Sequence, residues 1–240
     1  MNRKYISSVI LNKEINIDSY LCDLPVVHHL MKNKSISFEN DVTFFVGENG
    51  TGKSTLLEAI AIAYGFNAEG GTKNFNFSTN KTHSELYEYL TLSKSTYAQD
   101  GFFLRAESFY NFATNVDELE LFDSYGGKSL HNQSHGESFL SLVQNRFSGN
   151  GIYILDEPEA ALSPSRLLTL IAEMNALVNK NSQFIIATHS PILMAFPNAQ
   201  IYQLTKNGIE IVPYQQTEHY QLTKMFLENP GQILKYLLEE

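Results

Sequence analysis

The eight-residue segment Gly47–Ser54 constrains the fold more than any other part of this sequence. Its residues, GENGTGKS, fit the pattern G-x-x-x-x-G-K-[S/T] in full. An apolar run, 42–46 (VTFFV), precedes it, and 54–64 (STLLEAIAIAY) follows with apolar residues at helical spacing. A glycine-rich turn between a strand and a helix is the context in which this pattern binds phosphate groups. We therefore expect strand, phosphate-binding loop and helix here, with a nucleoside triphosphate as the ligand.

Each residue type in this loop suits one part of a bound triphosphate. The glycines let backbone N–H groups turn toward anionic oxygens at the start of the following helix. Lys53 is expected to reach the β- and γ-phosphates, and the Ser54 hydroxyl to coordinate Mg²⁺. The predicted nucleotide-binding residues of the loop are Gly47, Asn49, Gly50, Thr51, Gly52, Lys53, Ser54 and Thr55.

A second buried strand is expected at 151–155 (GIYIL), and it leads directly into Asp156-Glu157-Pro158. An aspartate at the end of a parallel strand beside the phosphate loop is expected to hold Mg²⁺, usually through water. The neighbouring Glu157 would point onward and orient the attacking water as a general base. The ordinary alternative is a capped turn that enters a helix.

A third strand is expected at 184–188 (FIIAT), and His189 follows it. Ligands in parallel α/β sheets bind at the carboxyl edge of the strands, so His189 is a candidate contact for the γ-phosphate or the attacking water. A lone histidine is more often structural.

The segment 133–138 (QSHGES) stands just before an expected helix of about 136–143. The Ser134 hydroxyl and the Gly136 N–H at a helix start make a second anion site, or alternatively a simple helix cap. If this segment meets the ATP of a partner subunit, the nucleotide joins two chains.

The order of these elements resembles the ABC-ATPase superfamily: phosphate loop, S-x-G-E signature, apolar-D-E-P and T-H-S-P. Glu137 in the signature is similar to the form in SMC chromosome-organising and double-strand-break repair ATPases. LDEPEAALSP and ATHSP resemble the soluble ATPase group that includes the overcoming-lysogenization-defect nucleases. A resemblance to a small bacterial family of ABC-type or AAA-family ATPases covers nearly the whole chain, in GFNAEGG (65–71), NFNFST (74–79), FFLRAESF (102–109), SHGESF (134–139) and TEHY (217–220).

This resemblance implies an α/β P-loop NTPase fold of the ABC-ATPase type. Its core sheet would be mostly parallel, with an N-terminal antiparallel β part and an inserted helical subdomain. We expect one domain over 1–240, in which 66–145 forms the irregular and helical insertion that ends in the signature. Strands that alternate with helices agree with a parallel sheet.

The resemblance also implies roles for single residues. Lys53, the base Glu157 and the switch histidine His189 would act in catalysis, with Ser54 and Asp156 on Mg²⁺. Ser134, Gly136 and Glu137 would contact the ATP of the partner in an ATP-dependent homodimer, and Ala161-Leu162-Ser163 would cross the interface.

The sequence departs from the family pattern at two points. The glutamine that usually follows the strand into the helical subdomain is replaced by Glu107, or is Gln99. No aromatic residue is clearly placed to stack on adenine, and the candidates are Tyr5, Tyr20 and Phe38.

Composition limits the expected binding partners and the cellular compartment. The chain carries a formal net charge of −9, which disfavours a dedicated DNA-binding domain but leaves room for a local basic strip. Its single cysteine, Cys22, agrees with a reducing compartment, and no segment has the length of a signal peptide or membrane span. These features predict a cytoplasmic protein.

We expect a soluble ATPase that drives a switch on an unidentified protein or nucleic-acid partner, in nucleic-acid maintenance or defence by family analogy. The alternatives are the nucleotide-binding subunit of an ABC transporter, an ATP-gated binding module with little hydrolysis, and a small-molecule kinase. Elsewhere we expect short strands and turns over 1–46, a short helix near 84–92, a helix over 164–178, and amphipathic helices from Glu218 onward.

Overall fold

A six-stranded sheet forms the centre of the protein, in a computed structural model that describes residues 4–72, 84–106, 109, 113, 114, 116 and 134–238. The strand order is β5-β6-β7-β3-β8-β9. The first five strands are parallel, and β9 pairs antiparallel with β8 as a hairpin. The strands are β3 (Val42–Gly47), β5 (Asp100–Arg105), β6 (Gly151–Asp156), β7 (Gln183–Ala187), β8 (Gln200–Thr205) and β9 (Gly208–Ile211).

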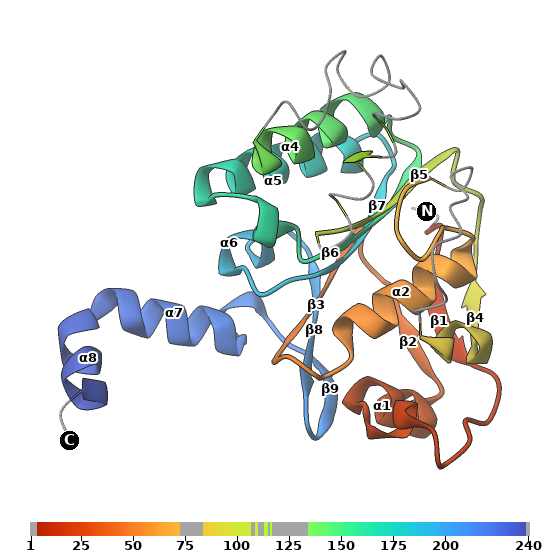
Figure 1. The fold of residues 1–240 in the computed structure, drawn as a ribbon, viewed down its shortest axis with the longest axis horizontal. Helices are drawn as coiled ribbons and strands as arrows, with labels where there is room; N and C mark the ends of the chain where they lie inside the picture. Colours follow the sequence, from red (N-terminus) through yellow and green to blue (C-terminus); the bar gives the residue numbers. More distant parts are fainter. Residues whose placement is uncertain are drawn as a thin grey trace.

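Three strands from the N-terminal half of the chain form a smaller antiparallel sheet, in the order β2-β1-β4 (Figure 1). Its strands are β1 (Ser8–Leu11), β2 (Ser35–Ser37) and β4 (Leu90–Ser93). The α-helices are α1 (Pro25–Asn33), α2 (Lys53–Tyr64), α4 (His135–Arg146), α5 (Pro164–Val178), α6 (Pro191–Met194), α7 (Glu218–Glu228) and α8 (Pro230–Leu238). Short 3₁₀ helices are η1 (Tyr20–Asp23), η2 (Glu85–Tyr89), η5 (Pro158–Ala161) and η6 (Tyr214–Gln216).

The central sheet separates two hydrophobic cores. Phe45 belongs to the core that contains α1, α2 and the small sheet. Phe44 and Val46, on the opposite face of the same strand, belong to the core with α4, α5 and α6. Every residue of β3 and of β6 is buried, as expected for parallel strands covered on both faces. The predicted fold, a mostly parallel core sheet with an antiparallel N-terminal part, is confirmed.

Two expectations for the N-terminal half were wrong. Residues 25–33 form α1 rather than strands and turns, because Pro25 opens the helix and Val26, Val27 and Leu30 bury one of its faces. The helix expected near 84–92 is only one 3₁₀ segment, η2, after which the chain enters β4 of the small sheet.

The segment 66–145 contributes to both sheets through β4 and β5 and ends one residue before the end of α4. Most of its predicted helical part lies outside the described residues, so the boundaries of the insertion stay a prediction. Phe109, Ala113 and Val116 are buried against the core that includes α4 and α5.

The last two helices, α7 and α8, extend away from the sheets (Figure 1). Beyond Tyr220, almost every residue of this arm is exposed, including Leu222, Leu227 and Leu237. Within the part of the chain that the structure describes, no helix has both the length and the apolar character to cross a membrane.

Candidate nucleotide-binding site

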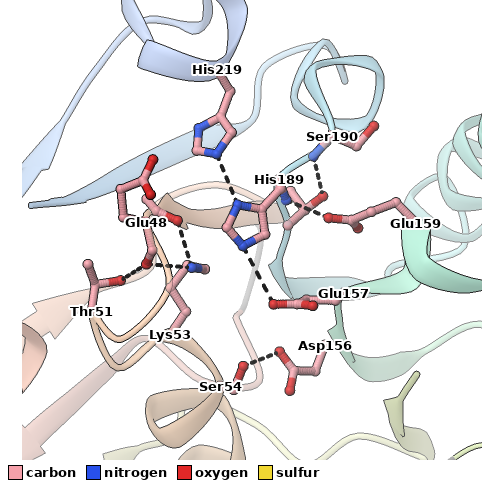
Figure 2. A network of polar contacts seen from close by, with 12 residues as sticks. Glu48, Thr51, Lys53, Ser54, Asp156, Glu157, Glu159, His189, Ser190 and His219 are labelled. Carbon is pink, nitrogen blue, oxygen red and sulfur yellow. Dashed lines mark hydrogen bonds and ion pairs between the residues drawn. The ribbon is translucent and has the colours of Figure 1, made fainter. Parts of the chain in front are cut away.

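The carboxyl ends of three neighbouring strands bring the predicted motifs together. In the sheet, Asp156 pairs with Ala187, and Ala187 pairs with Phe45. The phosphate loop after β3, Glu157 after β6 and His189 after β7 therefore lie at one edge of the sheet, as Figure 2 shows. Segments more than 100 residues apart along the chain thus form a single site.

The Lys53 side chain is folded against its own loop. Its Nζ donates to the carbonyl oxygens of Gly47 at 2.7 Å and Glu48 at 3.0 Å, and Lys53 is only 4% exposed. Burial lowers the pKa of Lys53, while the negative charges of Glu157 and Asp156 act in the opposite direction. The ammonium group is thus held where a triphosphate would offer it stronger, charge-assisted partners.

Two glycines of the loop are required by close packing. Gly47 has φ of 143°, and a Cβ there would lie 2.3 Å from the backbone oxygen of Leu204 in β8. Gly52 has φ of 92°, and a Cβ there would lie 2.4 Å from Val26 in α1. The backbone N–H of Val26 also donates to the Thr51 carbonyl at 3.3 Å. The helix that sequence reasoning missed therefore supports the phosphate loop directly.

The predicted Mg²⁺ ligands are in contact with each other. Ser54 Oγ donates to Asp156 Oδ1 at 3.0 Å, and Asp156 is 6% exposed. A hydroxyl and a carboxylate are oxygen ligands of the kind that Mg²⁺ takes in phosphate-transferring sites, where substrate phosphates and water complete its shell. The side chains present therefore fit the ion.

Arg105, the last residue of β5, also contacts Asp156. Its Nε is 3.6 Å from Asp156 Oδ2, and its Nη1 donates to Glu58 Oε2 at 2.6 Å. Glu58 also accepts from the backbone N–H of Ser84 at 2.8 Å. Arg105 thus ties Asp156 to α2 and offsets part of the negative charge at the end of β6.

Glu157 takes up a backbone conformation that is rare for a residue with a side chain. Its φ of 51° and ψ of 52° are left-handed, and its N–H donates to the Ala187 carbonyl at 3.0 Å. The side chain is 39% exposed, and its Oε1 lies 3.6 Å from His189 Nε2. Such strain is found preferentially at functional sites.

His189 is held from three directions. Its backbone N–H donates to Glu159, its Nε2 faces Glu157, and its Nδ1 lies 3.0 Å from Nε2 of His219 (Figure 2). Burial, and then the positive charge of Lys53, lower the pKa of His189. Burial raises the pKa of the Glu159 carboxyl.

Sequence reasoning did not single out His219, which α7 brings to the site. Burial and the Lys53 charge lower the pKa of His219 as well. The only signal in the sequence is the segment TEHY, which carries a family resemblance but no chemistry of its own.

The predicted signature caps α4 within this chain. The Ser134 hydroxyl donates to Glu137 Oε2 at 2.6 Å, and the Ser134 N–H donates to the same oxygen at 3.0 Å. Arg166 adds contacts at 3.1 Å to the Ser134 hydroxyl and to Glu137 Oε1. The Ser134 side chain lowers the pKa of Glu137. The helix-cap reading is thus correct locally, and the contact in trans stays a prediction.

The start of α4 faces the site in its own chain. A cavity of about 280 Å³ is lined by Ser54, Asp156 and Glu157 on one side and by His135 on the other, together with Ala106, Phe109, Ala160 and Ala161. The predicted Mg²⁺ position therefore shares this cavity with the start of the signature helix α4.

Other predicted contacts are placed differently. Gln99 directly precedes β5, at the opposite end of that strand from Asp156, and it cannot reach the Mg²⁺ position. Glu107, the other candidate, lies outside the described residues. Tyr5 and Phe38 are buried in the core, which excludes them from stacking on a base. Tyr20 is 57% exposed and its hydroxyl donates to Ser84 at 3.0 Å.

The fold and the site together define an α/β domain of the P-loop NTPase class. A family model described as an AAA domain matches residues 16–191, which is more than half of the chain. The chain belongs to this family. A comparison with curated protein sequences found no match.

Solved structures of SMC heads and transporter cassettes share the fold. An SMC head bound to the C-winged helix domain of ScpA has a TM-score of 0.52 at 14% identity, covering 87% of this chain and 98% of that one. The cbiO1 structure from Clostridium perfringens, part of the ABC transporter complex cbiONQ, has a TM-score of 0.50 at 16% identity, covering 99% and 100%. At these identities the likeness shows the fold alone.

Proposed function

We propose that this protein binds Mg-ATP and hydrolyses it at a site that two copies of the chain complete together. The observation that carries the proposal is the meeting of Lys53, the Ser54–Asp156 pair and the Glu157–His189 pair at one sheet edge. Each of these supplies a function that phosphoryl transfer needs: charge on the phosphates, metal ligands, and a base for water.

The side chains divide the work by position. ATP would supply the transferable phosphoryl group and Mg²⁺ the charge that bridges its phosphates. Lys53 would exchange its two carbonyl contacts for phosphate oxygens, while Ser54 and Asp156 hold the metal side of the site. Glu157 Oε1 would accept the proton of the attacking water, and His189 Nε2 would donate to the γ-phosphate or to that water.

Ser134, Gly136 and Glu137 support the second-copy part of the proposal. They sit at the start of α4, which packs against η5 and α5. Ser134 and Glu137 are exposed there, whereas Gly136 is buried, and a Cβ at Gly136 would lie 3.0 Å from the Ala161 carbonyl oxygen. The signature and the Ala161–Ser163 loop therefore form one continuous surface. In an ATP-bound homodimer, this surface would close over the partner's nucleotide.

The dimer would act on a further, unidentified protein or nucleic acid. One SMC head of the same fold is bound to the C-winged helix domain of ScpA. We place this chain, by analogy, among ATPases of nucleic-acid maintenance or defence, where ATP-driven closure and opening is passed on to a partner.

A mixing experiment separates a shared site from a site complete in one chain. Lys53→Ala removes phosphate binding, and Ser134→Asp keeps a good helix-capping residue but places a negative charge where the partner's phosphate would lie. Each variant alone is expected to be inactive. In an equal mixture about half of the dimers are mixed and retain one intact site, so about a quarter of the wild-type rate should return.

The matched control is Ser134→Asn, which also caps the helix but carries no charge. It should keep far more activity than Ser134→Asp. A mixture as inactive as its components would refute the shared site. Wild-type protein that binds ATP tightly without measurable turnover would instead favour the ATP-gated binding module.

A further inference from the structure

The proposed function gives a role to His189 but none to His219, whose ring is in contact with it. The two rings meet at a centroid distance of 5.1 Å and an angle of 61°, with Nδ1 of His189 3.0 Å from Nε2 of His219. Two histidines in hydrogen-bonding contact must share a single proton between the facing nitrogens if both rings are neutral.

The surroundings decide which nitrogen carries that proton. Burial and the nearby Lys53 charge lower the pKa values of both imidazoles, which favours their neutral forms. His219 Nδ1 is buried and has no hydrogen-bond partner among the residues that the structure describes. A buried acceptor without a partner occurs more often than a buried N–H without one. The favoured arrangement therefore has the His219 proton on Nε2, donated to His189 Nδ1.

This arrangement determines the other face of His189. With Nδ1 accepting, the His189 proton must sit on Nε2, which faces Glu157 Oε1 at 3.6 Å. His189 thus presents an N–H donor, rather than a lone pair, to the space where substrate and water would react.

The root of α7 is anchored firmly enough to hold His219 in place. Thr217 is fully buried, and its hydroxyl caps the helix by accepting from the N–H of Tyr220 at 3.3 Å while donating to the Tyr214 carbonyl at 2.8 Å. The N–H of Glu218 donates to Gln203 of β8 at 3.1 Å. The rings of Tyr214 and Tyr220 pack edge to face at 4.7 Å. His219 and Tyr220 are partly buried at this anchor, and α7 is exposed from Gln221 onward.

We propose that His219 is a positioning residue that holds His189 with its proton on Nε2, directed toward Glu157 and the reacting phosphate. The inference rests on the proposed ATPase function and extends it to the C-terminal helices. It makes α7 part of the working site, because its second residue sets the orientation of His189.

Two substitutions of similar polarity test this idea. In His219→Gln, the side-chain amide nitrogen can take the position of Nε2 and donate to His189. In His219→Asn, the amide reaches only as far as Nδ1 and loses the contact. We expect His219→Asn to lower kcat at least about tenfold, the size of effect typical for partners that orient a functional histidine. The KM for ATP should stay within about twofold, because Lys53 and the phosphate loop are unchanged.

His219→Gln should keep kcat within about threefold of wild type. The exposed α7 residue Gln221 provides the control, and Gln221→Ala should leave turnover unchanged. Near-wild-type kcat in both His219 variants, or an equal loss in both, would overturn the positioning role. Only a hydrogen bond to His189 depends on how far the amide group reaches.

A second measurement keeps the test independent of turnover. Nitrogen-15 spectra of histidine-labelled protein should show His189 protonated on Nε2 in the wild type and in His219→Gln, with a changed tautomer population in His219→Asn. A wild-type His189 protonated on Nδ1 would refute the inference even if the protein hydrolyses ATP. Absence of ATP turnover with the expected tautomer would refute the proposed function alone.

Discussion

The left-handed backbone of Glu157 predicts a conflict between stability and activity at one residue. A left-handed conformation costs a residue with a Cβ about 1–2 kcal/mol, and glycine does not bear this cost. Glycine in turn increases the conformational entropy of the unfolded chain, which removes about 0.4–1 kcal/mol of stability. Since φ is 51° and ψ 52° at this position, Glu157→Gly should stabilise the fold by about 1 kcal/mol.

The matched variant is Glu157→Gln, which removes the charge but keeps the strained backbone. Like Glu157→Gly, this variant loses the repulsion between Glu157 and neighbouring carboxylates and the contact with His189. That pair is partly exposed and contributes little to stability. The difference between the two variants therefore isolates the backbone term.

Thermal unfolding without nucleotide is the assay. For a chain of this length about 1 kcal/mol corresponds to a Tm difference of about 2–4 °C. Both variants should hydrolyse ATP about 10²–10⁴-fold more slowly than the wild type, because this is the usual contribution of a general base. Glu157→Gly melting at or below Glu157→Gln would show that the backbone here is not strained, and the reasoning would fail.

Two further predictions concern other parts of the site. Gly47→Ala should destabilise by about 2 kcal/mol more than Gly50→Ala in urea unfolding, because its Cβ would lie 2.3 Å from a backbone oxygen of β8 while Gly50 has open space around it; equal losses would contradict the close approach. Burial raises the pKa of Glu159 above its unfolded value, so the penalty of its charge is absent below the unfolded pKa and appears as pH rises through the folded pKa. Glu159→Gln should therefore raise Tm at pH 8 and leave it unchanged near pH 3.5, and the opposite pattern would refute the assigned cause.

The parts of the site that the sequence predicted are those that local patterns encode. The phosphate loop, Asp156, Glu157 and His189 each follow a strand whose apolar run is readable on its own, and parallel strands end at a common edge. The structure brings them together as expected. Their catalytic roles remain proposals.

The elements that sequence reasoning missed lack such a pattern or carry one that was not used. The dipeptide Asn207-Gly208 is a general turn signal, but the surrounding strands were not singled out. In the structure the β8–β9 hairpin turns through Lys206 and Asn207, and Gly208 begins β9. The helix α1 is short, and its support of the loop through Val26 depends on tertiary packing. The His189–His219 contact joins residues 30 positions apart on separate segments, and no sequence pattern around either histidine indicates the contact.

The pairing of β3 with β7 and β8 has a consequence for how the chain reaches its native state. Val42 lies opposite Phe184, and Thr43 opposite Gln200, so the central strand finds its neighbours only after about 140 residues of intervening chain have been brought into place. Such distant pairings slow folding, and until they form the phosphate loop has no Asp156 beside it. A nucleotide that bridges the two would bind the completed sheet alone and shift the folding equilibrium toward it. ATP would then act on this chain as a folding ligand, and nucleotide supply would influence how much of the protein survives unfolding and degradation.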